Sequence, residues 1–272
     1  MQNKINLLMA YPYIKPEIIP FIHKRQKDFR FLIDSGAFTA WKSGKPIQLD
    51  DYCRFIEGLP FEPFKYFTLD VIGDPEASFK NYQIMLDRGF TPIPIFTRGE
   101  DLSMVDEYYK TSDVLGIGGL VGTRKNKGFV KGIMQKIGKR KVHWLGFTNK
   151  TFISYYKPYM CDCSSWSYVM RWGYMLVYDM KGGFKTIYRK DFKKKLSKEI
   201  FDLISNLGVD PNDLRDDRAW EKEGSLAGMV GARGYYLKTL QCEKMFNTKM
   251  FLACATLGQL EMLLKARSGV YE

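Results

Sequence analysis

The sequence has few of the residues that build metal centres and disulfide frameworks. It contains two histidines and five cysteines in 272 residues. An odd number of cysteines without a secretion signal argues against a set of disulfides. The only close pair, Cys161 and Cys163, lacks the second cysteine or histidine pair of a structural zinc site. We therefore expect reduced thiols, no bound metal and no zinc subdomain.

Long apolar runs are missing as well. No run approaches the ~20 apolar residues that a membrane-spanning helix needs. The stretch INLLMAY after Lys4 is too short for the apolar region of a signal peptide and is not followed by a small-residue cleavage site. We expect a soluble, cytoplasmic protein that does not bind a membrane.

Acidic residues are outnumbered by basic ones. The chain has 42 Lys and Arg against 30 Asp and Glu, a formal charge of +12. The runs KNKGFVKGIMQKIGKRK and YRKDFKKKLSK alternate lysines with apolar residues, which is typical of helices with one solvated basic face. Such a face needs no ligand. An excess of this size over the whole chain nevertheless favours a polyanionic partner, because Lys and Arg contacts to phosphate supply most nonspecific affinity for nucleic acids.

Short β-rich runs alternate with segments long enough for helices, the pattern of a parallel sheet rather than a sandwich. Helices are predicted to begin after Asp50, Asp74 and Asp101, and Gly89 is expected to end the second of them. Together these elements predict an α/β fold, a single (β/α)8 TIM barrel. The predicted strands are residues 5–10, 31–33, 66–69, 91–96, 114–117, 142–145, 159–163 and 175–178.

The C-terminal part differs in character. From about residue 191 the sequence is charged and has a helical pattern. We therefore expect one domain over residues 1–272, with a barrel core at about 1–190 and a helical extension at about 191–272 that completes it. Residues 233–266 predict one or two long closing helices, with no further strand.

Three aspartates close three of the predicted strands. Asp34 ends FLIDSG, Asp70 ends YFTLDV and Asp162 lies in YMCDCSS. Chemistry in a (β/α)8 barrel takes place at the carboxyl ends of the strands. One such aspartate often only caps the next turn, but three in one barrel favour a shared site. Residues two apart share a strand face, which groups the three aspartates with Leu32, Thr68 and Met160.

Several carboxylates and few other reactive groups suit glycosidic exchange. One carboxylate attacks the anomeric carbon, and another group handles the proton on the departing base. The sequence has no Ser-His-Asp order, phosphate-cradling glycine loop or metal-binding histidine cluster that points to another chemistry. His23 is predicted on a helix face and His143 within a strand, with no part in the site.

Five motifs in this order resemble those of the tRNA-guanine transglycosylase superfamily, including its DNA-modifying 7-deazaguanine branch. DSGAF at 34–38 is similar to the family's DSGGF, and Asp70 to its second base-reading aspartate. GIGGLVG at 116–122 resembles A-x-GGL-x-G, HWLGF at 143–147 resembles the h-LMGVG strand, and CDC at 161–163 resembles F-D-C. The resemblance spans residues 31–165, about half of the chain.

The resemblance implies base exchange by double displacement without a cofactor. Asp162 would attack the anomeric carbon of a guanosine and expel guanine, and Asp34 would act as general acid and base. A 7-deazaguanine such as preQ0 would then enter and attack the same carbon, so that configuration is retained. The base-binding residues implied are Asp70, Ser35, Gly118, Gly119, Leu120 and Thr97.

The chain also departs from the family. The Val-Gln-Gly segment, with its base-contacting glutamine, is replaced by FTRG at 96–99, which leaves Thr97 or Arg98 as candidates. The zinc insertion of the tRNA enzymes is absent, and SSWSY at 164–168 replaces Pro-Thr-Arg. These departures favour the compact DNA-modifying relatives often associated with bacteriophages. DNA is therefore the expected polymer, with tRNA as the alternative and a catalytically inactive nucleic-acid-binding barrel as a third hypothesis.

An aromatic and basic cluster follows the predicted nucleophile. A base in duplex DNA must leave the stack before Asp162 can reach its sugar, and aromatic rings with Lys or Arg suit stacking and phosphate contact. Packing of the rings in the core is the equally open alternative. The predicted nucleic-acid contacts are Trp166, Tyr168, Arg171, Trp172, Lys193, Lys194 and Lys195, with Tyr174 in the same cluster.

Overall fold

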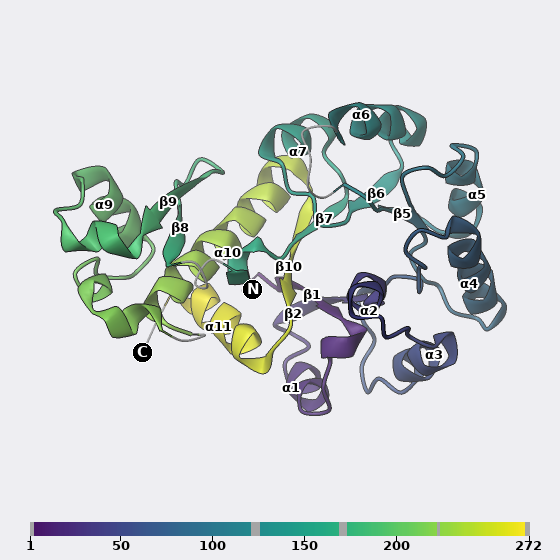
Figure 1. Ribbon diagram of the computed structural model, residues 1–272, viewed down its shortest axis with the longest axis horizontal. Coiled ribbons are helices and arrows are strands. Elements are labelled where there is room, and N and C mark those ends of the chain that lie inside the picture. Colours follow the sequence, from purple (N-terminus) through teal and green to yellow (C-terminus); the bar gives the residue numbers. More distant parts are fainter. Residues whose placement is uncertain (1–2, 121–125, 169–172, 222–223, 270–272) are drawn as a thin grey trace.

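The structure is a computed structural model that describes residues 3–120, 126–168, 173–221 and 224–269. Eight parallel strands form one curled sheet in the order β3-β2-β1-β10-β7-β6-β5-β4, with helices around it (Figure 1). The prediction of a (β/α)8 barrel-like fold is confirmed. The barrel strands are β1 (Ile5–Ala10), β2 (Phe29–Asp34), β3 (Lys65–Tyr66), β4 (Ile95–Phe96), β5 (Val114–Ile117), β6 (Lys141–Trp144), β7 (Met160–Cys163) and β10 (Lys249–Cys254).

The two outermost strands of this sheet, β3 and β4, meet through a single parallel bridge. Phe67 pairs with Ile93 just beyond the regular strands. Ile93 N donates to the Tyr66 carbonyl at 2.8 Å, and Thr68 N donates to the Ile93 carbonyl at 2.9 Å. These two hydrogen bonds bring the edges of the curled sheet together, so the carboxyl ends of all eight strands surround one mouth.

The helices that follow the strands face the outside of the sheet. Asp74 caps α4 as predicted, because its side chain accepts from Ala77 N at 2.9 Å. Asp50 lies within α3 instead of capping it, and Asp101 accepts from Ser103 N in the turn before α5. The helices are α1 (Ile18–Lys24), α2 (Ala37–Ser43), α3 (Leu49–Glu57), α4 (Pro75–Asp87), α5 (Met104–Thr111), α6 (Asn126–Ile137), α7 (Lys150–Tyr156), α8 (Ser165–Tyr168), α9 (Lys198–Asn206), α10 (Leu226–Phe246) and α11 (Leu257–Ser268). No described helix is both long and apolar enough to cross a membrane.

The eighth strand of the barrel corrects the sequence prediction. Residues 175–178 do form a strand, β8 (Tyr174–Tyr178), but it pairs antiparallel with β9 (Phe184–Tyr188) outside the barrel. The strand that closes the barrel is β10, between β1 and β7. Two closing helices, α10 and α11, do form, but the expectation of no strand between them is wrong. Asn247 ends α10 in the left-handed conformation (φ 54°) and releases the chain into KMFLAC.

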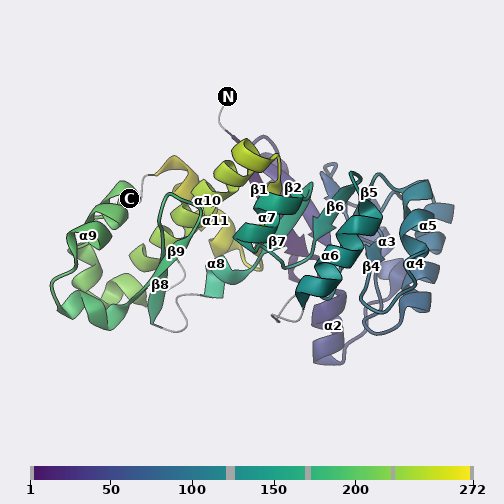
Figure 2. The same cartoon turned by 90° about the horizontal axis from the view of Figure 1, so that it is seen from above.

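Three apolar clusters divide the interior. One fills the barrel between the strands and includes Leu8, Leu32, Phe67, Met160 and Phe251. A larger one lies between the sheet and the surrounding helices. The third belongs to an extension formed by β8, β9, α9 and three short 3-10 segments, Arg189–Lys193, Asp213–Arg215 and Asp217–Trp220. The extension packs on α10 beside the barrel, as Figure 2 shows. The barrel core therefore does not end near residue 190, because its last strand and both flanking helices come after the extension.

Candidate active site

Three carboxyl groups meet at the mouth of the barrel, of which Asp70 is buried and Asp34 and Asp162 are partly buried. Asp34 is the last residue of β2, Asp162 lies in β7, and Asp70 follows β3. Ser35 Oγ donates to Asp70 Oδ1 at 3.2 Å, which joins the segment after β2 to the segment after β3. The groups are close enough for repulsion to matter: the charge of Asp162 raises the pKa of Asp34, and the charge of Asp34 raises the pKa of Asp70. The fold thus brings together the three aspartates that the sequence singled out.

Asp34 is held by the tight turn that follows it. Its Oδ1 accepts from Gly36 N at 2.8 Å. Gly36 has φ 82°, and a Cβ at this position would lie 2.3 Å from Pro12 Cδ, so glycine is required here. Burial raises the pKa of Asp34, and the negative charge of Asp162 acts in the same direction. The Gly36 hydrogen bond and the nearby His143 oppose the rise in pKa.

Asp70 reaches the mouth by a route that strand alternation did not predict. Thr68 Oγ1 contacts Met85 Sδ of α4 at 3.7 Å, so Thr68 faces away from the barrel interior. The chain is irregular after Phe67, and Asn81 Nδ2 holds it by donating to the Leu69 carbonyl at 2.9 Å. The shared face predicted for Thr68 and Asp70 is therefore wrong, although Asp70 still lies in the site. Burial, with repulsion from Asp34, raises the pKa of Asp70 to about 7.

Asp162 is fixed through one of its two oxygens. His143 Nε2 lies 2.9 Å from Oδ1, and Gly146 N donates to the same oxygen at 2.9 Å. Oδ2 makes no hydrogen bond to a described residue, and the side chain is 13% exposed. One oxygen is thus anchored, and the other has no hydrogen-bond donor within the described chain. This is the arrangement that a nucleophilic carboxylate needs.

His143 is a site residue that the sequence analysis missed. It lies in β6 as predicted, but its ring is fully buried and points into the barrel, edge-on to Phe67 with centroids 4.9 Å apart. Its Nδ1 is buried without a hydrogen-bond partner among the described residues. A proton on Nδ1 would therefore be unsatisfied, which favours the tautomer that carries it on Nε2 and donates it to Asp162. The pairing register of β6 with β7 places His143 opposite Met160, two residues before Asp162. The sequence does not specify this register.

The other predicted base-binding residues lie at the ends of β4 and β5. Gly118 N donates to the Phe96 carbonyl at 2.9 Å, and a Cβ on Gly118 would lie 3.2 Å from Thr97 Cγ2. Gly119 and Leu120 follow directly, with the Leu120 side chain in the core. The Thr97 hydroxyl donates to Glu100 Oε1 at 2.8 Å, so it keeps only its acceptor lone pairs for a ligand. These residues lie at the carboxyl ends of β4 and β5, the same end of the sheet at which Asp34 lies on β2.

A hollow of about 330 Å³ opens next to Asp70. Its walls are largely apolar and come from α2, residues 44–47 and the segment after β3. Trp41 is 61% exposed on α2, and its ring lies 5.9 Å from that of Phe38, which is 62% exposed. An apolar hollow with a carboxyl group at its wall suits a flat, polar-edged ligand. The residues that line it in the described chain include Asp70 but neither Asp34 nor Asp162.

The predicted nucleic-acid contacts have different outcomes. Trp166 is 3% exposed and donates from Nε1 to the Ala253 carbonyl at 2.8 Å, so its ring packs in the core and the prediction that it stacks on a base is wrong. Arg171 and Trp172 lie outside the described residues, and only the backbone of Tyr168 is described, in α8. The tyrosine at 174 is partly buried against Tyr188. The three lysines at 193, 194 and 195 are all exposed.

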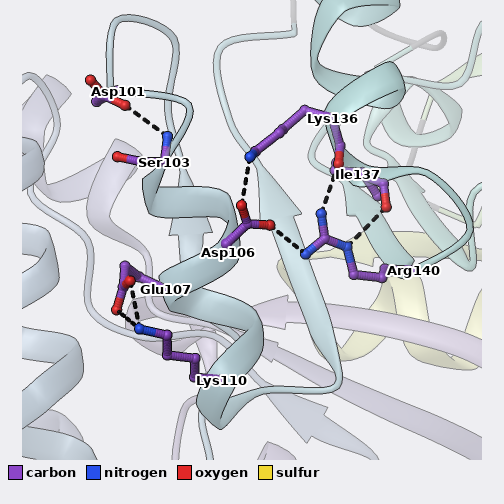
Figure 3. A network of polar contacts seen from close by, with 8 residues as sticks. All are labelled: Asp101, Ser103, Asp106, Glu107, Lys110, Lys136, Ile137 and Arg140. Carbon is purple, nitrogen blue, oxygen red and sulfur yellow. Dashed lines mark hydrogen bonds and ion pairs between the residues drawn. The ribbon is translucent and has the colours of Figure 1, made fainter.

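The basic run at 125–141 is partly neutralised within the fold. Lys136 and Arg140 both bind Asp106 of α5, at 2.5 and 2.8 Å, as Figure 3 shows. Lys141 pairs with Asp113 at 3.1 Å. These cations connect α5 and β5 to the α6–β6 region. They are therefore less available to an anionic partner than the sequence suggested.

Within the described residues there is no group of three or more His, Cys, Asp or Glu side chains that could hold a metal ion. All five cysteines are buried free thiols. Comparison with protein-family models, curated proteins and solved structures gives no match to this chain.

The raised pKa of Asp70 predicts a stability effect. The folded chain keeps this proton up to about pH 7, whereas the unfolded chain loses it near the ordinary value of 3.8. The contribution of Asp70 to stability is therefore complete below pH 3.8 and is lost as the pH rises toward 7. An asparagine side chain does not ionise, so the variant Asp70→Asn does not lose stability in this way as the pH rises. We expect the gain in the free energy of unfolding over the parent chain to be roughly 2 kcal/mol larger at pH 8 than at pH 5.

Urea unfolding of both proteins at the two pH values measures this difference. Asp87→Asn, at an exposed position of α4, is the matched control and should show no such pH dependence. An equal effect of Asp70→Asn at both pH values would contradict the prediction.

Proposed function

We propose that this protein is a nucleic-acid guanine transglycosylase that exchanges guanine for a 7-deazaguanine base in DNA. The observation that carries the proposal is the anchoring of Asp162 Oδ1 by His143 and Gly146, which leaves Oδ2 without a donor in the described chain, at a site where the charge of Asp162 acts on Asp34. An anchored carboxylate beside a carboxyl of raised pKa is the pairing of nucleophile and general acid used in retaining glycosyl transfer.

The proposed reaction has two displacements at one carbon. Asp162 Oδ2 attacks C1′ of the target deoxyguanosine, the C1′–N9 bond breaks, and Asp34 gives a proton to the departing guanine. The incoming base then loses its proton to Asp34 and attacks C1′, and the bond to Asp162 breaks. Two inversions retain the configuration. The raised pKa of Asp34 suits a group that must hold a proton in one step and take one in the next.

Asp70 is proposed to read the edge of the base. Guanine and 7-deazaguanines present N–H donors on the Watson–Crick edge, and an ionised carboxylate accepts from them. Because the pKa of Asp70 is about 7 in the free protein, base binding should strengthen as the pH rises through neutrality. Ser35 holds Asp70 Oδ1, and backbone groups of Gly118, Gly119 and Leu120 would face the flat ring. The basic charge of the chain supports a polynucleotide as the substrate.

The test is base exchange in isolated nucleic acids. We expect the protein to incorporate labelled guanine or preQ0 into DNA, and Asp162→Asn to abolish incorporation while DNA binding is retained. The measurement is nucleoside mass spectrometry of DNA and tRNA after incubation with the labelled base. Incorporation into tRNA alone would identify a tRNA enzyme instead. No incorporation into either polymer, with binding intact, would favour the inactive nucleic-acid-binding barrel.

The contact between His143 and Asp162 predicts a positioning role. His143→Ala removes one of the two donors to Asp162 Oδ1 and leaves Gly146 N as the other, and a hydrogen bond to a charged group contributes about 1.5–3 kcal/mol. We expect kcat to fall roughly 10- to 100-fold with KM little changed. His143→Gln, whose amide nitrogen can reach the place of Nε2, should recover part of kcat. Equal losses in both variants with unchanged stability would contradict the positioning role.

A further inference from the structure

The extension carries a basic hollow at the end of its hairpin. This hollow has a volume of about 500 Å³ and is lined by Gly173, Tyr188, Arg189, Lys190, Lys193 and Asp217. Three of the six residues are cations and one is an anion. Arg189 and Asp217 neutralise each other in an ion pair of 2.6 Å. The two lysines make no ion pair with a described residue, so the hollow has a net positive charge.

The local backbone explains why both lysines face the hollow. Arg189–Lys193 is a 3-10 segment, which has three residues per turn, so side chains at i and i+3 lie above one another. Lys190 and Lys193 are three residues apart and therefore share one face. Phe192 is 2% exposed, on another face, and packs edge-on against Trp220 with centroids 5.5 Å apart. The segment is thus fixed to the core of the extension, and the lysines are held together on a rigid support.

An aromatic ring completes the hollow. Tyr188 is 47% exposed, and Lys190 Nζ lies 5.5 Å from the centre of its ring. The backbone of Tyr188 is fixed, because its N–H donates to Asp191 Oδ2 at 2.9 Å. The ring also lies against Tyr174, with centroids 5.9 Å apart. An exposed aromatic ring beside two ammonium groups that have no ion-pair partner in the described chain is a combination that binds single-stranded nucleic acid by stacking and phosphate contact.

The hollow lies on the same side of the molecule as the barrel mouth. Gly173 is only eleven positions after Asp162, and Arg189 N donates to the Gly173 carbonyl at 2.9 Å, which places the hollow at this end of the hairpin. In Figure 2, β8 begins on the lower side of the molecule, the side on which α2, the helix after β2, also lies. A strand that enters the mouth with one nucleotide can therefore continue toward the extension.

We propose that this hollow binds the phosphodiester backbone of the nucleic-acid strand on one side of the reacting nucleotide. Lys190 and Lys193 contact phosphates, and Tyr188 stacks on a neighbouring base. The identity of the polymer rests on the proposed function, whereas the binding site itself does not depend on catalysis. This inference also refines the sequence prediction of Lys193, Lys194 and Lys195, because Lys193 lines the hollow, and its partner there is Lys190.

The test measures binding without turnover. In the Asp162→Asn chain, the affinity for a guanine-containing single-stranded DNA is measured by fluorescence anisotropy between 50 and 200 mM salt. Each phosphate contact on a single strand contributes about 0.7 to the slope of log affinity against log salt. We expect Lys190→Ala/Lys193→Ala to reduce that slope by about 1.4. Tyr188→Ala should weaken binding roughly tenfold without changing the slope, because stacking carries no charge.

The matched control is Lys24→Ala/Lys27→Ala, which removes two exposed lysines beside the amino-terminal end of β2, on the opposite side of the barrel. Its slope should stay within about 0.3 of the parent chain. An equal fall in slope for both double variants, or no fall for Lys190→Ala/Lys193→Ala, would overturn the site.

An RNA strand of the same sequence is the second arm of the test. If Lys190→Ala/Lys193→Ala reduces the slope equally with RNA, a site for the phosphodiester backbone is supported. If the double variant changes the slope with neither DNA nor RNA, the site is refuted. If the slope changes as expected but the unsubstituted protein exchanges no base, the proposed enzyme activity is refuted and the binding site is still supported.

Discussion

The burial of carboxyl groups close to one another, to which their mutual repulsion adds, is the constraint on which this structure depends. A closed parallel barrel brings all strand ends to one mouth, and here three of those ends carry aspartates. Unpaired charges in such a place are unfavourable, so the groups must share protons or find donors. The raised pKa of both Asp34 and Asp70 is a direct result. A fold chosen only for stability would place apolar residues there.

The residues around the mouth donate different hydrogen bonds to the three carboxyl groups. Asp162 has two donors to one oxygen, Asp34 has one backbone donor, and Asp70 has the Ser35 hydroxyl. Chemically similar groups thereby acquire different properties. In the proposed reaction, Asp162, which has the most donors, is suited to attack, and Asp34, whose pKa is raised, is suited to carry a proton. The separation of roles comes from the environment of each carboxyl group, because the side chains are identical.

Some of this arrangement could be read from the sequence, and some could not. Asp34 and Asp162 end or lie within regular strands, so alternation with Leu32 and Met160 placed them correctly, and both neighbours do line the barrel interior. Asp70 follows a strand of only two residues, where alternation no longer applies. The contact of His143 depends on the register between β6 and β7, which sequence patterns do not specify.

The misplaced eighth strand has a similar cause. KMFLAC is short and lies between two long helical patterns, so it resembles a continuation of the helices. Its partner β1 is more than 240 residues earlier in the chain, and only the closed sheet makes the pairing necessary. The strand predicted at residues 175–178 does form as β8, but its antiparallel partner β9 lies directly after it in the chain. Local pattern identified the strand, whereas tertiary pairing decided to which sheet it belongs.

The most direct measurement of the central claim is to trap the covalent intermediate. The protein is incubated with a guanine-containing DNA strand without any free base, denatured, and digested for mass spectrometry of its peptides. We expect a DNA strand that has lost guanine and is joined through C1′ to Asp162, and that is released when guanine is added before denaturation. An adduct on another residue, or continued base exchange by Asp162→Asn, would contradict it.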